Sequence, residues 1–122
     1  MGQAAIVIKR AYEAPSKSDG LRVLVDRLWP RGLKREDAAI DAWLKDVAPS
    51  DGLRRWYKHD PKKWTEFRRR YLAELRDSVA LAELRAMRSQ GDKLTLLFAA
   101  KDAERNNAAA LREALENGVR RR

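Results

Sequence analysis

The sequence contains no cysteine and only one histidine, His59. The absence of cysteine excludes disulfide bonds, thiolate nucleophiles and zinc–thiolate sites together. A single histidine also argues against a histidine-rich metal site, so we expect neither a metal nor a cofactor. His59 lies between two expected helices, beside Lys58 and Asp60. We therefore interpret it as a surface turn residue rather than a catalytic base.

Long hydrophobic runs are also missing. The longest largely apolar stretch, Leu94–Ala100, has seven residues, whereas a helix needs about 20 to span a bilayer. The N-terminus lacks the basic-then-apolar pattern of a signal peptide, and Ile6 stands where a myristoylation site requires serine or threonine. We expect a cytoplasmic protein without a membrane partner.

The composition is that of a compact and highly charged protein. The chain has 122 residues, of which 44% are hydrophobic and 37% charged, which is enough for one domain with its own core. No linker or repeat divides it. We expect a single domain over residues 1–122, with residues 117–122 forming a frayed basic tail. The sequence leaves the oligomeric state open.

Positive charge is in excess and unevenly distributed. The formal net charge is +9, and residues 54–76 hold nine basic side chains against three acidic ones. Three arginines end the chain at 120–122. Such a surplus attracts polyanions, including nucleic acid and phosphorylated metabolites. The alternative interpretation is a solvated helix face in a basic protein.

Three stretches have the composition of β-strands: Ala5–Tyr12, Arg22–Trp29 and Lys93–Ala100. The last is apolar on both faces, which is typical of a central strand. The loop over residues 13–21 is shorter than the usual parallel crossover. The first two strands should therefore pair antiparallel or lie apart in the sheet.

The clearest helix is predicted over residues 61–77. Trp64, Phe67 and Tyr71 recur at helical spacing, and we interpret this aromatic stripe as core, because bases can stack only on exposed rings. Further helices are expected over residues 33–47, after Ser50, and over 78–90 and 103–117. Within 33–47 an extended segment through Trp43 is the alternative. The predicted fold is α/β: a small mixed or mostly parallel three-stranded sheet covered by about five helices.

The ends of two strands carry the candidate site. Asp26 and Arg27 end the second strand and Arg31 follows at a Pro-Arg-Gly turn; in parallel sheets, ligands bind at the carboxyl ends of strands. The alternatives are a structural Asp26–Arg27 ion pair, or an aspartate that bonds the amides of the next turn.

The third strand ends in a second group of polar residues. Lys101 and Asp102 are followed by Arg105, Asn106 and Asn107. With Asp102 as its N-cap, a helix here would offer free amides and a positive dipole end to an anion. The alternative is that one of the two asparagines caps a helix that starts later.

Several segments together resemble the YeaO-like family of small bacterial proteins, which belongs to a wider domain-of-unknown-function family. The segments are VLVDRLWPRG (23–32), WLKDVAPS (43–50), LRRWYKHDP (53–61), FRRRYLAEL (67–75) and LLFAAKD (96–102), followed by Asn106-Asn107. The resemblance implies a compact α/β fold and a bacterial cytoplasmic origin, but no established reaction. More distant branches often carry a Cys-His pair where this chain has Asn106-Asn107, so thiol chemistry is not transferred.

Two functions follow as hypotheses. In the first, the carboxyl edge of the sheet binds a phosphate- or carboxylate-bearing small molecule through Arg27, Arg31, Lys101, Arg105, Asn106 and Asn107. Asp26 or Asp102 would then be the general base if chemistry occurs. In the second, the protein binds nucleic acid through residues 54–76 and the arginine tail, with strong salt dependence.

Overall fold

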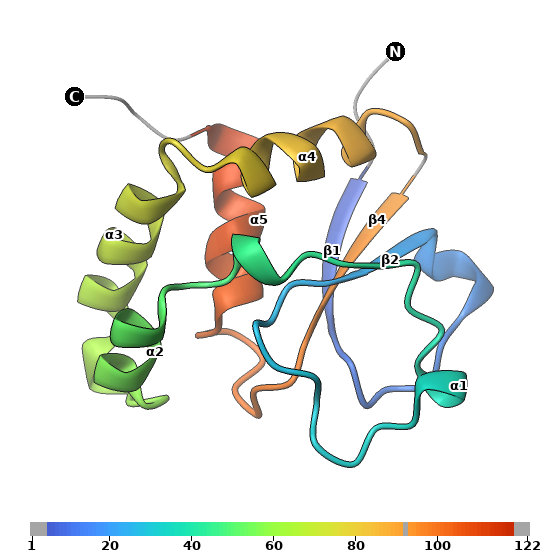
Figure 1. Cartoon of the computed structure of the whole chain (residues 1–122), viewed down its shortest axis with the longest axis horizontal. Helices are drawn as coiled ribbons and strands as arrows, with labels where there is room; N and C mark the ends of the chain where they lie inside the picture. The colour runs from blue at the N-terminus through green and yellow to red at the C-terminus, as the bar shows by residue number, and fades with distance from the viewer. Residues whose placement is uncertain (1–4, 92, 119–122) are drawn as a thin grey trace.

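The computed structural model describes residues 5–91 and 93–118, and a four-stranded sheet forms its centre (Figure 1). All neighbouring strands are parallel, in the order β1-β4-β2-β3. The α/β class is confirmed, but the prediction of three strands was wrong. The strands are β1 Ala5–Arg10, β2 Leu21–Leu24, β3 Ala42–Trp43 and β4 Lys93–Phe98.

Five α-helices occur among the described residues, as expected: α1 Arg35–Ala38, α2 Asp51–Tyr57, α3 Trp64–Leu75, α4 Val79–Arg88 and α5 Asn107–Asn117. Three short 3₁₀ helices join them: η1 Lys17–Asp19, η2 Lys45–Val47 and η3 Pro61–Lys63. The predicted basic tail at 117–122 lies outside the described residues, apart from Asn117, which ends α5, and Gly118, which caps it.

The central position predicted for the third strand is confirmed, because β4 pairs with both β1 and β2. The first two strands lie apart in the sheet, which was the second of the two predicted arrangements. Leu96 is buried on one face of β4 and Leu97 on the other. A strand that is apolar on both faces is most stable in the middle of a sheet, where both faces are covered.

Two segments were predicted with the wrong boundaries. The second strand ends at Leu24 instead of Trp29, and the Trp29 indole donates a 2.7 Å hydrogen bond to the carbonyl of Leu33. The helix predicted over 33–47 forms only near its start, as α1. Ala39 adopts φ +48° and ends α1, and Trp43 then enters the sheet beside Leu24. The extended alternative was therefore correct only for Ala42 and Trp43, since Lys45 begins η2.

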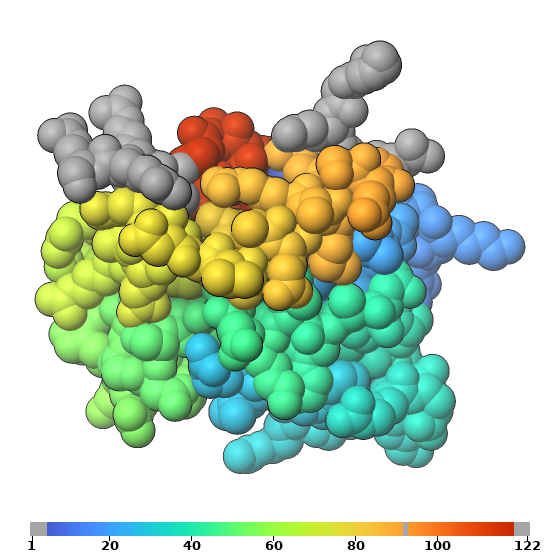
Figure 2. All heavy atoms as spheres, turned by 45° about the horizontal axis from the view of Figure 1, so that its top comes forward, coloured from blue at the N-terminus to red at the C-terminus, as the bar shows by residue number. Residues whose placement is uncertain are grey.

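The main core lies on one side of the sheet. Helices α2, α3, α4 and α5 bury Leu53, Phe67, Leu84 and Leu111 there against the strands. Figure 2 shows α4 lying across the molecule next to the segment that carries η2. The aromatic stripe of α3 is core, as predicted, since Phe67 and Tyr71 are buried.

The other side of the sheet has a smaller core and is covered mainly by the connection over residues 25–41. Leu24 and Leu97 are buried there beside Trp29 and Trp43, whose rings meet edge to face with centroids 5.5 Å apart. The connections after β2 and after β4 therefore lie on opposite faces of the sheet.

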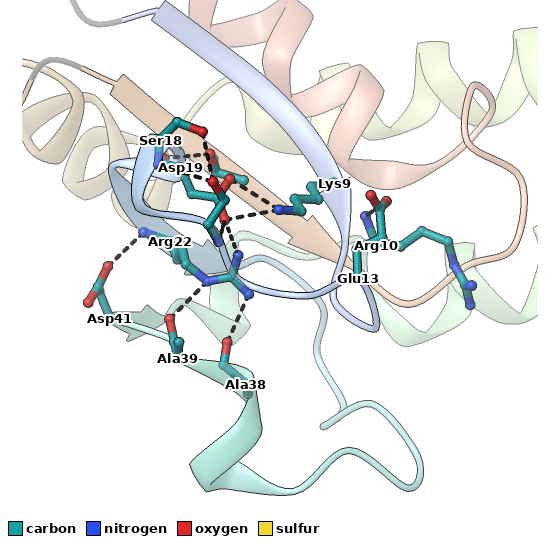
Figure 3. Close-up of polar contacts among 11 residues, drawn as sticks. Lys9, Arg10, Glu13, Ser18, Asp19, Arg22, Ala38, Ala39 and Asp41 are labelled. Atoms are coloured by element: carbon teal, nitrogen blue, oxygen red, sulfur yellow. Dashed lines mark hydrogen bonds and ion pairs between the residues drawn. The ribbon is translucent and has the colours of Figure 1, made fainter.

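A buried ion cluster holds the loop between β1 and β2 against this second face (Figure 3). Asp19 is 5% exposed and accepts from Arg22 at 2.5 Å and from Lys9 at 3.1 Å. The Arg22 guanidinium also donates to the carbonyls of Ala38 and Ala39. The Asp19 carboxylate and the Arg22 guanidinium thus connect strand β1, the loop before β2 and the residues that end α1.

Candidate functional site

The candidate site lies where β2 and β4 end side by side. After Leu24 the chain crosses one face of the sheet, and after Phe98 it leads into α5, which packs on the opposite face. Neighbouring parallel strands whose connections leave toward opposite faces open a crevice between their carboxyl ends. This is the position at which we expected a ligand to bind from the sequence.

A cleft of about 780 Å³ occupies this position. Seven of the eight predicted site residues line it, whereas Arg105 does not; the seven are Asp26, Arg27, Arg31, Lys101, Asp102, Asn106 and Asn107. Residues from the two strand ends, far apart in sequence, therefore converge on one cavity. Its volume is within the range of small-molecule sites, about 300–1,000 Å³.

Asp26 connects the two strand ends at this cleft. One carboxylate oxygen accepts a 2.9 Å hydrogen bond from the Ala99 amide, and the other accepts a 3.0 Å bond from the side chain of Asn107. Burial raises the pKa of Asp26 above its usual value, although both hydrogen bonds act in the opposite direction. Asp26 is thus the more basic of the two predicted proton carriers.

Arg27 does not pair with Asp26, so that interpretation was wrong. Its guanidinium instead lies 3.6 Å from Asp51 and 3.9 Å from Asp46. The Nε atom of Arg27 is buried and makes no hydrogen bond within the described part of the chain. The long distances to both carboxylates leave the terminal nitrogens of this guanidinium available to another acceptor, whereas the buried Nε is out of a ligand's reach.

The predicted helix start at Ala103 was also wrong. Asp102 accepts from the amides of Glu104 and Arg105 in a separate turn, and these bonds lower the pKa of Asp102. Asn106 is extended, with φ −138°, and accepts from the Ala109 amide as the N-cap of α5. The alternative, in which an asparagine caps a later helix, is confirmed.

Lys101 and Arg105 are both exposed, but they differ in position. Lys101 lines the cleft, whereas Arg105 directs its guanidinium to Asp102 at 3.7 Å. The carbonyl of Arg105 accepts from the buried Tyr57 hydroxyl at 3.0 Å. The geometry therefore offers Lys101 to a ligand more directly than Arg105.

Sequence reasoning missed several residues of the site. Arg10, at the end of β1, donates to the carbonyls of Ala99 and Ala100 and so holds the backbone that lines the cleft. Arg54 of α2 and His59 also line the cleft. Arg10 could have been found by the rule that selected Asp26, since it too is a charge at the carboxyl end of a strand.

His59 is an exposed turn residue, as predicted, and it also borders the cleft. Both Lys58 and His59 have positive φ, 49° and 56°. No group of three or more histidine, aspartate or glutamate side chains in the described part of the chain is placed to hold a metal ion. None of the described helices is long and apolar enough to cross a membrane.

Several basic side chains of residues 54–76 make internal contacts. Arg68 pairs with Glu113, and both Arg69 and Arg70 pair with Glu66. Arg70 also lies over the Trp56 ring, 4.4 Å from its centroid. These contacts use charges that the nucleic-acid hypothesis requires for phosphate binding.

Comparison with known proteins places these features in a family. A profile described as the inactive DUF488-N3 subclade matches residues 5–122. The uncharacterized protein Rv3073c of Mycobacterium tuberculosis is 43% identical over 113 residues, which cover 93% of this chain and 95% of that protein. The uncharacterized protein YeaO of Escherichia coli is 40% identical over 112 residues, which cover 92% of this chain and 97% of that protein. No solved structure matches.

Proposed function

Because the chain belongs to the inactive DUF488-N3 subclade, and its resemblance to YeaO is thereby confirmed, we propose that it binds a small phosphate- or carboxylate-bearing molecule without turning it over. The observation that carries this proposal is the convergence of Arg27, Arg31 and Lys101 on one cleft at the carboxyl edge of a parallel sheet. Membership of a subclade described as inactive favours ligand binding over catalysis.

The charges around the cleft support an anionic ligand. Four permanently charged cations line it, against the two carboxylates Asp26 and Asp102: Arg27, Arg31, Arg54 and Lys101. An arginine can bind a phosphate or carboxylate through two parallel hydrogen bonds, whereas a lysine acts as a point charge. Arg27 is half-buried, and its guanidinium makes only long contacts with Asp46 and Asp51, at 3.9 and 3.6 Å.

Proton transfer remains the alternative use of the same cleft. Asp26 would be the proton carrier, because burial raises its pKa, whereas backbone hydrogen bonds lower the pKa of Asp102. Turnover of any bound ligand that is lost in Asp26→Asn, without loss of ligand binding, would favour this alternative over binding alone.

The first prediction is that Arg27→Ala weakens ligand binding by about 10- to 100-fold, the loss expected for a hydrogen bond to a charged group. A thermal-shift screen of inorganic phosphate, sugar phosphates, nucleotides and small carboxylates would identify the ligand. At about a hundred times its dissociation constant, it should add roughly 2.7 kcal/mol of stability. Isothermal titration calorimetry would then compare the wild-type and variant affinities.

The matched control is Arg69→Ala. Arg69 is exposed on α3, pairs with Glu66 and does not line the cleft, so its removal should leave small-molecule affinity unchanged. Equal affinity of wild type and Arg27→Ala would contradict the proposed site. Stabilisation by oligonucleotides alone, lost as salt rises and in Arg69→Ala, would favour the nucleic-acid hypothesis.

A further inference from the structure

The orientation of the Asn107 amide is fixed by its surroundings. Its nitrogen lies 3.1 Å from the carbonyl oxygen of Val25 and 3.0 Å from a carboxylate oxygen of Asp26. A backbone carbonyl can only accept, so the nitrogen rather than the oxygen of the amide must face Val25. Both hydrogens of the amide nitrogen are then used within the protein.

This orientation leaves unused acceptors in the cleft. The side-chain oxygen of Asn107 accepts no hydrogen bond from the described residues, and it is not among their buried unpaired atoms. Asp26 receives one donor on each oxygen, which leaves a lone pair on each. Asn107 and Asp26, which we call the acceptor pair, thus present only acceptors to a ligand.

Cations and acceptors differ in depth. Three of the four cations, Arg31, Arg54 and Lys101, are exposed, whereas Arg27 and both members of the acceptor pair are half-buried. An anionic group therefore meets the three exposed cations first, and the Asp26 carboxylate repels it from the acceptor pair. A ligand that uses both sets must carry its negative charge at one end and a hydrogen-bond donor at the other.

The rest of the lining is apolar and suits a flat group between these two ends. Leu28 lines the cleft and is 62% exposed. Small or rigid residues continue the apolar lining, namely Pro30, Pro49, Ala99 and Ala100. Neither a sugar phosphate nor an inorganic anion would cover this surface.

We propose that the ligand is a nucleotide-like anion: a phosphate held by the exposed cations, and a flat ring whose N–H groups donate to Asn107 and Asp26. This rests on the proposed function and adds the ligand class to it. The acceptor pair sets the specificity, because a ring without N–H donors leaves both acceptors without partners when water is displaced.

Calorimetry on the wild-type protein tests this with matched ligands. The donor-bearing ligands are the monophosphates of adenosine, guanosine, cytidine and uridine. Purine riboside 5′-monophosphate has the ring and the phosphate but no N–H donor on the ring, and ribose 5-phosphate lacks the ring. At least one donor-bearing nucleotide should bind about 10-fold or more tightly than both.

The outcomes separate the two proposals. Equal affinities for the donor-bearing nucleotides, purine riboside 5′-monophosphate and ribose 5-phosphate would overturn the inference and leave anion binding intact. No binding by any of them or by another small anion would overturn both. In Asn107→Leu, the preference for the donor-bearing nucleotide should shrink, because only Asp26 still accepts, while ribose 5-phosphate still binds; an unchanged preference would also overturn the role of the acceptor pair.

Discussion

Replacing Asp19 by alanine should lower the free energy of unfolding by about 3–5 kcal/mol, the cost of leaving a buried charge without its partner. Asp19 is 5% exposed, and it is the carboxylate that neutralises Arg22, which is 4% exposed. Without it, the Arg22 guanidinium would face only the carbonyls of Ala38 and Ala39. Urea denaturation followed by circular dichroism measures the loss.

The control for this substitution is Glu116→Ala, which removes an exposed acid near the end of α5 and should change stability by less than about 0.5 kcal/mol. A loss below about 1 kcal/mol in Asp19→Ala would show that the cluster contributes little net stability. That result would indicate that backbone contacts, rather than the ion cluster, hold the loop between β1 and β2.

The pH dependence of the same cluster gives a separate check. Burial alone would raise the pKa of Asp19, but hydrogen bonds from the Ser16 amide, Lys9 and Arg22 lower it to about 2. Between the unfolded value of 3.8 and this folded value, the unfolded chain binds more protons. Stability is therefore lost as pH falls through this window, by about 2 kcal/mol for this group. Asp19→Asn should lack that part of the acid dependence.

Features set by neighbouring residues could be predicted from the sequence. Ser50 and Ser78 cap α2 and α4, as the pattern of small polar residues before apolar runs indicates. The central strand was evident because it is apolar on both faces, and the burial of Phe67 and Tyr71 from their helical spacing. In each case the signal lies within one element, so no tertiary information is needed.

Features set by contacts between distant segments could not be predicted in detail. β3 has two residues and owes its existence to β2, whose Leu24 pairs with Trp43; two residues have no periodicity of their own. The common edge of Asp26 and Asn107 followed from the rule for parallel strands. Their hydrogen bond did not, because it joins residues 81 positions apart.

Replacing Asn107 by aspartate should destabilise the protein by about 3 kcal/mol at neutral pH. The change puts an oxygen where a nitrogen now donates at 3.0 Å to Asp26 and at 3.1 Å to the carbonyl of Val25. Two hydrogen bonds become two contacts between acceptors, and one of them sets carboxylate against carboxylate. Because like charges so close cannot both ionise freely, the pair would take up a proton at a raised pKa.

The sign of the pH effect distinguishes this mechanism from simple loss of packing. A raised pKa in the folded variant means that it binds more protons than its unfolded chain, so the variant regains stability as pH falls through the pKa of the pair. Chemical denaturation at pH 8 and pH 5 should show the deficit shrinking toward the acid side. Gln90→Glu, which adds the same charge at an exposed position, should show almost no deficit at either pH. A pH-independent deficit in Asn107→Asp would instead indicate that geometry, and not charge, fixes Asn107 beside Asp26.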